Sequence, residues 1–168
     1  MAKKPLLSVV LDTSFLITLC DNRRPHHEVA KQYFKYWVEH RTIMFLPAIA
    51  YTEYLSKAEK IPDVVLRYLK VKSFNAEDAE IAAKIQRERI VIRDGEGVQR
   101  DAFKDDIKII GSACTLCASA IAHDDSNSMH KFIHAAAEKF TVAAELKSIC
   151  LDAGYNDGLA ALSDPTLL

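Results

Sequence analysis

Glycine and proline are scarce in this chain, which holds only 5 of each among its 168 residues. A chain made mainly of loops, or one without a folded core, would be expected to contain more of both. Hydrophobic residues make up 49% of the chain, and at this length folding buries about two-thirds of the unfolded surface. We therefore expect a single domain over residues 1–168, with its core at about residues 6–152 and a short C-terminal tail.

Long apolar runs are missing as well. The apolar run near the N-terminus stops at Asp12 and is too short for the core of a signal peptide. No stretch approaches the roughly 18 apolar residues of a membrane span. These shortages predict a cytoplasmic protein without membrane contact. Thiols stay reduced in the cytoplasm, so we expect free cysteines at Cys20, Cys114, Cys117 and Cys150.

A surplus of positive charge is also absent, because 22 basic side chains face 23 acidic ones and the net charge is −1. A strongly basic chain would indicate a nucleic-acid partner through its overall field. Here any polyanion has to be held by a local basic patch or by a bound metal ion. The charge balance counts mildly against a nucleic-acid substrate and does not exclude it.

Two residue pairs have the spacing of zinc ligands. Cys114 and Cys117 form a Cys-x-x-Cys pair, but the chain has no second pair to complete a structural zinc site. His130 and His134 share a helix face, yet no Glu follows His130 as a zinc-protease motif requires. We therefore interpret the cysteines as small core residues and the histidines as part of a partly exposed helix face.

Short β-branched or apolar runs alternate with longer helical patterns along the chain. The expected strands are Ser8–Leu11, Ile43–Leu46, Val71–Phe74, Ala118–Ala122 and Leu146–Leu151. The expected helices are Phe15–Leu19, Glu28–His40, Ala48–Lys60, Asn75–Arg89 with Asn75 as the cap, Asp101–Cys117 and Met129–Phe140. This alternation predicts an α/β fold, a three-layer α/β/α sandwich with a mainly parallel central sheet.

Acidic residues stand where two of the expected strands end. Asp12 directly follows the first strand, and Asp124 and Asp125 follow the fourth. Ligands of open α/β sheets bind at the carboxyl ends of the strands. The alternative is that Asp12 and Asp124 are simple N-caps, since a helical pattern follows each.

Two further acids lie within largely apolar helices, Glu53 in the third expected helix and Asp106 in the fifth. A lone buried charge is costly, and several carboxylates brought together must either hold protons or bind a cation. Mg²⁺ and Mn²⁺ favour such oxygen-only sites. In the alternative reading Glu53 is a solvated helix residue, and Asp105 and Asp106 pair with nearby lysines.

The order of these acids resembles the PIN-domain family over about residues 6–140. Val9–Ile17 is similar to its opening strand followed by Asp-Thr-Ser, and Pro47–Leu55 is similar to its second, glutamate-bearing element. Asp106–Ala113 matches the third element, an Asp followed by an apolar, small-residue helix. Asp124 falls where the family places its fourth acid.

The fourth element departs from the family pattern. Ala122 stands where Thr or Ser is common, and the adjacent Asp125 competes with Asp124 for the role of fourth acid. The distance along the chain from Asp106 favours Asp124. The same comparison of spacing favours Asp106 over Asp105 as the third acid.

The resemblance implies an Mg²⁺- or Mn²⁺-dependent endoribonuclease that hydrolyses phosphodiester bonds in single-stranded RNA. The catalytic and metal-binding residues would be Asp12, Glu53, Asp106 and Asp124, acting directly or through water. Ser14, Asp125 and Asp105 would support them. Small bacterial members are often VapC-type toxins, which dimerise and are blocked by an antitoxin, so an antitoxin and a homodimer are expected partners.

Basic residues near these elements are candidates for holding nucleic acid, although each could equally belong to a solvated face. The candidates are Arg23, Arg24, Lys57 and Arg100.

Three other functions compete with the endoribonuclease. A haloacid-dehalogenase-like phosphatase would need an acid two residues after Asp12, and that position is Ser14. A PIN-type nuclease acting on DNA in a defence system would use the same acids. A degenerate PIN domain that serves only as a binding module is harder to reconcile with four retained acids.

Overall fold

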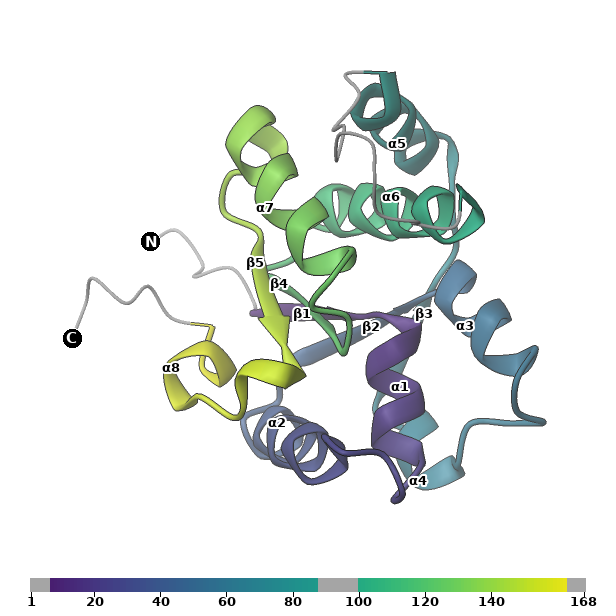
Figure 1. Cartoon of the computed structure of the whole chain (residues 1–168), viewed down its shortest axis with the longest axis vertical. Helices are drawn as coiled ribbons and strands as arrows, with labels where there is room; N and C mark the ends of the chain where they lie inside the picture. The colour runs from purple at the N-terminus through teal and green to yellow at the C-terminus, as the bar shows by residue number, and fades with distance from the viewer. Residues whose placement is uncertain (1–6, 88–99, 163–168) are drawn as a thin grey trace.

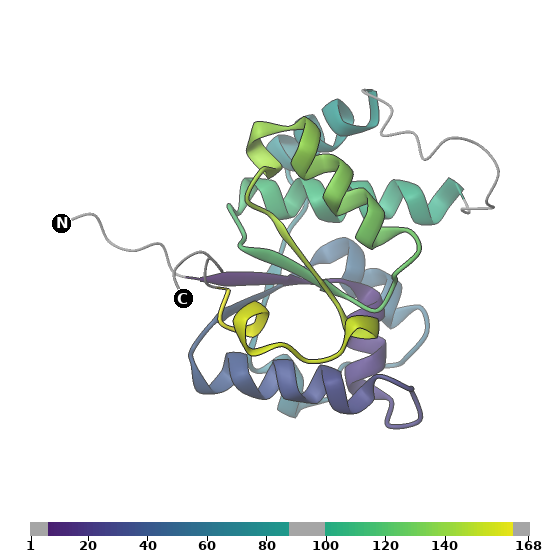
Figure 2. The same ribbon diagram turned by 60° about the vertical axis from the view of Figure 1, so that its left-hand side comes forward.

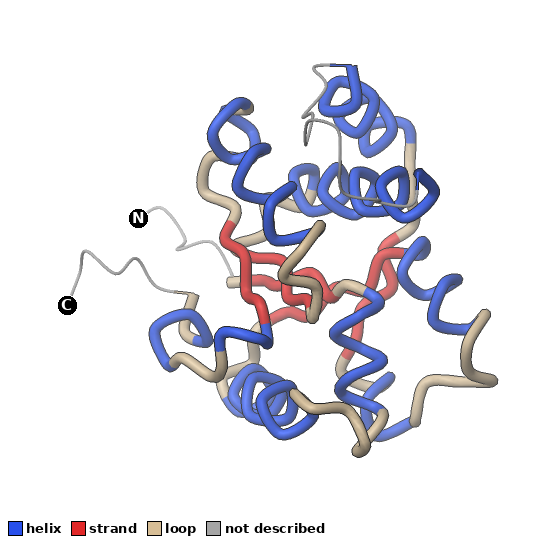
Figure 3. The backbone as a smooth tube through the Cα atoms, viewed as in Figure 1, coloured by secondary structure: helices blue, strands red, loops and turns tan. Residues whose placement is uncertain are grey.

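A five-stranded, all-parallel sheet forms the centre of the computed structural model, which describes residues 7–87 and 100–162 (Figures 1 and 3). The strand order is β3-β2-β1-β4-β5. The strands are β1 (Ser8–Leu11), β2 (Ile43–Pro47), β3 (Leu69–Lys72), β4 (Ala120–His123) and β5 (Lys147–Cys150). All five predicted strands are present, and the third begins two residues earlier than the sequence pattern indicated.

Helices cover both faces of this sheet, which confirms the predicted three-layer α/β/α sandwich. They are α1 (Thr13–Cys20), α2 (His27–Glu39), α3 (Ala48–Leu55), α4 (Asp63–Leu66), α5 (Ala76–Arg87), α6 (Arg100–Thr115), α7 (Met129–Lys139) and α8 (Asp157–Ala160). Helices α5, α6 and α7 lie on one side of the sheet, and α1, α2 and α8 lie on the other (Figures 1 and 2). Helix α3 contacts both α1 and α6, so it joins the two helical layers.

The predicted helix Ala48–Lys60 is wrong at its C-terminal end, because α3 stops at Leu55. The hydroxyl of Ser56 donates to the carbonyl of Glu53 at 2.6 Å, which competes with continuation of the helix. Farther on, Pro62 disfavours a helical conformation at the residue before it. The short helices α4 and α8 were not predicted, since four residues are too few to show a helical period.

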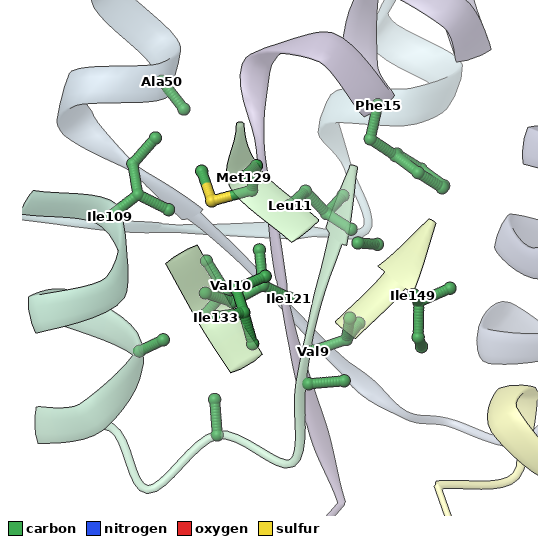
Figure 4. Close-up of a cluster of buried hydrophobic side chains, with 14 of the residues drawn as sticks. Val9, Val10, Leu11, Phe15, Ala50, Ile109, Ile121, Met129, Ile133 and Ile149 are labelled. Carbon is green, nitrogen blue, oxygen red and sulfur yellow. The ribbon is translucent and has the colours of Figure 1, made fainter. Parts of the chain in front are cut away.

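The core lies on both faces of β1 and β4, whose residues are all buried. Near-continuous apolar runs are typical of strands covered by helices on both sides. Figure 4 shows Val10 and Ile121 beside Ile133 of α7, whereas Phe15 of α1 lies on the other side of the strands. Because β1 and β4 are parallel neighbours held in the core, the residues that follow them lie together at the carboxyl edge of the sheet.

The aromatic side chains of α2 belong mainly to the core. Tyr33 and Trp37 are fully buried, and the indole of Trp37 donates to the carbonyl of Ala160 at 3.0 Å. The cysteine pair is split, because Cys114 is buried as predicted but Cys117 is exposed. Cys117 lies after the end of α6 with a positive φ of 49°, which turns its side chain away from the core.

The strand order reverses beside β1. The chain passes from β1 outward to β2 and β3, and then returns to place β4 on the opposite side of β1. Such a switch point opens a crevice at the carboxyl ends of the two strands, where ligands of this fold class bind. Asp12 follows β1 and Asp124 follows β4, so both acids lie at this switch point. None of the helices described is both long and apolar enough to cross a membrane.

Candidate active site at the carboxyl edge of the sheet

Asp12 is the N-cap of α1 and lies at the centre of the candidate site. Its backbone N–H donates to the carbonyl of Ala122 at 3.0 Å, which extends the pairing of β1 with β4 by one residue. Its Oδ2 accepts from the backbone N–H of Ser14 at 2.9 Å and from the Ser14 hydroxyl. Burial raises the pKa of Asp12, the nearby charge of Glu53 adds to this, and the Ser14 hydrogen bonds oppose it.

Asp106, on α6, is the second acid of the site with a raised pKa. Burial raises the pKa of Asp106 to about 8, and the charges of Asp12, Asp125 and Glu53 contribute to the shift. A single long hydrogen bond from the Ser128 hydroxyl, at 3.4 Å, opposes it. Asp106 therefore favours either a proton or a nearby cation.

Glu53 lies at the rim of the same group of acids. Its side chain is 40% exposed and forms an ion pair with Lys57, one helical turn later, with 2.6 Å between Oε1 of Glu53 and Nζ of Lys57. Its charge nevertheless raises the pKa of both Asp12 and Asp106. Asp12 before α1, Glu53 on α3 and Asp106 on α6 therefore lie near enough for their charges to act on one another.

Asp124 has both carboxylate oxygens occupied by neighbouring side chains. Its Oδ2 accepts from the Thr18 hydroxyl at 2.6 Å, and its Oδ1 contacts Nδ1 of His26 at 2.6 Å. Its backbone N–H donates to the Ser14 hydroxyl at 2.9 Å. Asp124 thus ties the end of β4 to α1 and to the start of α2.

Asp125 is the member of this acidic pair that acts on Asp106 electrostatically. Its Oδ1 accepts from the backbone N–H groups of Asn127 and Ser128, both at 2.9 Å, and its Oδ2 accepts from the Ser128 hydroxyl. The same hydroxyl contacts Asp106, so Ser128 bridges the two carboxylates. Burial would raise the pKa of Asp125, but the hydrogen bonds from Ser128 and Asn127 outweigh it and lower the pKa.

The acids do not converge on one point. Within residues 7–87 and 100–162, no three Asp, Glu, His or Cys side chains lie close enough together to enclose a metal ion. Within the same residues, no basic side chain forms an ion pair with Asp12 or Asp106. The donors around Asp12 and Asp106 are all oxygens, which is the donor chemistry of a hard divalent cation. Mg²⁺ commonly uses one or two carboxylates and keeps several waters, so this set of donors fits such an ion.

The remaining predicted residues lie around this group. Ser14 contacts both Asp12 and the backbone of Asp124, whereas Asp105 points to Lys108 at 2.9 Å instead. Among the basic candidates, Arg23 pairs with Asp21 at 2.9 Å and Lys57 pairs with Glu53. Arg24 is exposed. The side chain of Arg100 lies outside the described residues.

Sequence reasoning missed four side chains that contact the acids. Thr18 and His26 bind Asp124, Ser128 binds Asp125, and His123 accepts from the backbone N–H of Asp125 at 3.2 Å. The two partners of Asp124 are more than 90 positions away from it along the chain, so no local pattern points to them. His123 directly precedes the acidic pair, and a polar residue at the end of an apolar run was the one available signal.

Comparison with solved structures places this fold among VapC toxins. The chain superposes on a chain of VapBC2 from Rickettsia felis, solved with a fragment of promoter DNA, with a TM-score of 0.57 and 12% identity over 84% of this chain and 98% of that one. A DNA-bound VapBC from Salmonella typhimurium gives a TM-score of 0.54 and 20% identity, covering 86% and 99%. VapC20 from Mycobacterium tuberculosis, a toxin that cleaves the sarcin-ricin loop, gives 0.51 and 14%, covering 71% and 91%.

These likenesses establish the class of fold, an all-parallel α/β/α sandwich of the PIN type seen in VapC toxins. The fold resemblance inferred from the acidic motifs is therefore confirmed. No protein-family model and no curated protein sequence matches the chain. At 12–20% identity, the structural likeness carries the fold and leaves the activity to be argued from the site.

Proposed function

We propose that this protein is a metal-dependent nuclease of the PIN type that hydrolyses phosphodiester bonds in single-stranded RNA. The observation that carries the proposal is the crowding of Asp12 and Asp106 at the β1/β4 switch point. Both carboxyl groups have a raised pKa, and no basic residue in the described chain pairs with either. Such a site favours a divalent cation, which neutralises the repulsion between the carboxylates.

Asp12, Glu53 and Asp106 would hold an Mg²⁺ or Mn²⁺ ion, directly or through water. When bound, the ion supplies charge neutralisation at a phosphate oxygen and lowers the pKa of a water. The protein's own part is to keep these oxygens in place. Ser14 fixes the rotamer of Asp12, and Lys57 holds Glu53 at the rim.

The fourth acid would come from the adjacent pair after β4, and the contacts favour Asp125 over the residue that sequence spacing preferred. Asp124 has both oxygens committed to Thr18 and His26, on the side of α1 and α2. Asp125 shares the Ser128 hydroxyl with Asp106 and acts on its pKa. The electrostatic effect on Asp106 and the shared Ser128 hydroxyl therefore favour a position of the Asp125 carboxylate on the side of the proposed ion.

The proposed substrate and partners rest on the fold relatives. VapC20 cleaves an RNA loop, and two relatives were solved as VapBC complexes on DNA. We infer a toxin that acts on RNA, is blocked by an antitoxin protein and forms a homodimer. A PIN-type nuclease acting on DNA is the second candidate, since the acids would hold only the metal ion and a phosphate is common to both polymers.

The test is cleavage of defined single-stranded RNA and DNA oligonucleotides by the purified protein, with Mn²⁺ and with EDTA. We expect RNA cleavage that EDTA stops and Mn²⁺ restores. Asp12→Asn should reduce the rate by at least about 100-fold, the scale of losing a group that acts in the transition state. Cleavage that persists in EDTA would point to another mechanism, and no cleavage of either polymer would leave only a binding module.

Matched substitutions test the assignment of individual acids. Asp106→Asn should slow cleavage far more than Asp105→Asn, because Asp105 pairs with Lys108 outside the group. Asp125→Asn should slow cleavage by at least 10-fold and weaken Mn²⁺ binding. Asp124→Asn should lower the melting temperature with a smaller effect on Mn²⁺ binding, and the reverse order would restore Asp124 as the fourth acid.

A further inference from the structure

A buried line of polar side chains lies directly behind the acidic pair. His123 is the last residue of β4, and its ring is fully buried. Its Nδ1 contacts the backbone N–H of Asp125 at 3.2 Å, and its Nε2 contacts the hydroxyl of Ser148 on β5 at 2.7 Å. The same hydroxyl lies 2.8 Å from Nδ1 of His130 on α7. The line therefore joins β4, β5 and α7 behind the turn that carries the acids.

The directions of the two hydrogen bonds made by His123 follow from its partners. A backbone N–H can only donate, so Nδ1 of His123 has to accept from Asp125. The ring proton of His123 is then on Nε2 and is donated to Ser148. Ser148 accepts this proton, and its own hydroxyl proton is free to be donated to Nδ1 of His130, which lies 2.8 Å away. The protein thus fixes one tautomer of His123 by its surroundings.

This line of hydrogen bonds holds the turn after β4, where the side chain of Ala122 has no hydroxyl. Ala122, the residue before His123, has no polar atom in its side chain, so it cannot orient the turn by a side-chain hydrogen bond. His123 instead fixes the backbone of Asp125, while Asn127 and Ser128 fix its carboxylate. Both ends of this residue are therefore held, which sets the position of its carboxylate beside Asp106.

We propose that His123, held by Ser148, is a positioning residue for the acidic site, which orients Asp125 by accepting its backbone N–H. The effect of His123 on metal binding and cleavage rests on the proposed function. The hydrogen bonds of His123 do not depend on that function, so the positioning role and the proposed function can be contradicted separately. His130 completes the line through its contact with the Ser148 hydroxyl at 2.8 Å.

Two amide substitutions of the same residue separate positioning from packing. In His123→Asn the amide oxygen reaches the place of Nδ1 and keeps the bond to Asp125, whereas the Ser148 contact is lost. In His123→Gln the longer amide reaches the place of Nε2 and keeps the Ser148 contact, whereas the Asp125 bond is lost. A packing role predicts that Asn is worse, because the smaller side chain leaves the larger cavity. The positioning role predicts the opposite order.

The first measurement is Mn²⁺ affinity by calorimetry, together with kcat and KM on the RNA substrate. We expect His123→Asn to stay within about threefold of the wild-type dissociation constant. His123→Gln should weaken Mn²⁺ binding by about 10-fold or more, the size found for outer partners of metal ligands, and lower kcat without raising KM. Equal effects, or a larger loss in His123→Asn, would overturn the proposal.

The second measurement uses the metal-free protein and needs no activity. Nitrogen-15 NMR should show His123 with an unprotonated Nδ1 and a protonated Nε2. Amide hydrogen exchange of Asp125 should be faster in His123→Gln than in His123→Asn. A proton on Nδ1, or equal exchange in the two variants, would contradict the proposal. If the NMR and exchange results are as expected but the wild-type protein binds no Mn²⁺, the proposed function is contradicted and the positioning of Asp125 is not.

Ser148→Ala provides a second variant that leaves both histidine rings and all acids in place. It removes the acceptor of the His123 proton and the donor to His130. We expect Mn²⁺ binding to weaken by several-fold, with partial recovery in Ser148→Thr, which keeps the hydroxyl on a strand residue. Wild-type affinity in Ser148→Ala would show that His123 does not depend on this partner.

Discussion

At the scale of single residues, Asp106 links the stability of the metal-free protein to its chemistry. Its raised pKa, about 8, means that the folded protein holds a proton that the unfolded chain releases near pH 4. The stabilising effect of this proton is complete below the unfolded pKa and is lost as the pH rises through the folded pKa. A divalent cation has to displace the same proton, so Mn²⁺ should bind more tightly as the pH rises through about 8.

We predict that Asp106→Asn is more stable than the wild type when metal is absent. The gain should be smallest near pH 4 and reach about 1 kcal/mol at pH 9, a modest value because the carboxyl is partly exposed to solvent. For a domain of this size, that is a rise in melting temperature of about 2–4 °C. Melting curves in EDTA at several pH values check this, and a less stable variant at pH 9 would contradict the crowding argument.

At the scale of elements, the contact between α5 and α6 sets where Asp106 lies. Gly111, on α6, approaches α5 so closely that a Cβ would lie 2.9 Å from the carbonyl oxygen of Asp78 and 3.1 Å from the Cβ of Ala82. Asp78 is itself buried and bonded to Lys72 at 2.6 Å and to Thr115. The two helices are therefore joined by close packing and by the hydrogen bond from Thr115 of α6 to Asp78 of α5, while the ion pair with Lys72 ties α5 to β3.

We predict that Gly111→Ala destabilises the protein. Replacing glycine by alanine inside a helix normally adds about 0.5–1 kcal/mol of stability. Here the added methyl has to push the two helices apart, which should cost about 1–3 kcal/mol. Urea unfolding measures the sign directly. A stability equal to the wild type or higher would mean that α5 yields without cost.

At the scale of the whole molecule, the candidate site joins elements that are far apart in the sequence. Asp12, Glu53, Asp106 and Asp125 come from β1, α3, α6 and the turn after β4. A cation bound between them would therefore hold both helical layers to the sheet. A ligand that binds only the folded state stabilises it in proportion to its concentration relative to its dissociation constant.

We predict that Mn²⁺ at about 100 times its dissociation constant adds about 2.7 kcal/mol of stability to the wild-type protein. Asp12→Asn should lose most of this gain, whereas Asp105→Asn should keep it, because Asp105 is paired outside the group. Thermal melts with and without Mn²⁺ measure the difference. An equal shift in all three proteins would place the ion elsewhere on the molecule.

The local pattern of the sequence was sufficient for most of the fold. Helices cover both faces of the sheet, so strands such as Ser8–Leu11 are almost entirely apolar, and this pattern predicts a buried parallel strand. The cap at Asn75 was also readable, and its side chain does accept from the N–H of Asp78 at 3.0 Å. The end of α3 was not, since it depends on one serine hydroxyl turning back to its own helix.

The sequence by itself determined the layers, the parallel sheet and the acids at the ends of its strands, because periodicity and chain order are local properties. Only the tertiary structure decided how Asp124 and Asp125 differ. Thr18 and His26 occupy one carboxylate and Ser128 bridges the other to Asp106, and apart from Ser128 these partners are distant in sequence. A carboxylate's role depends on what surrounds it in space, and neighbours along the chain do not define those surroundings.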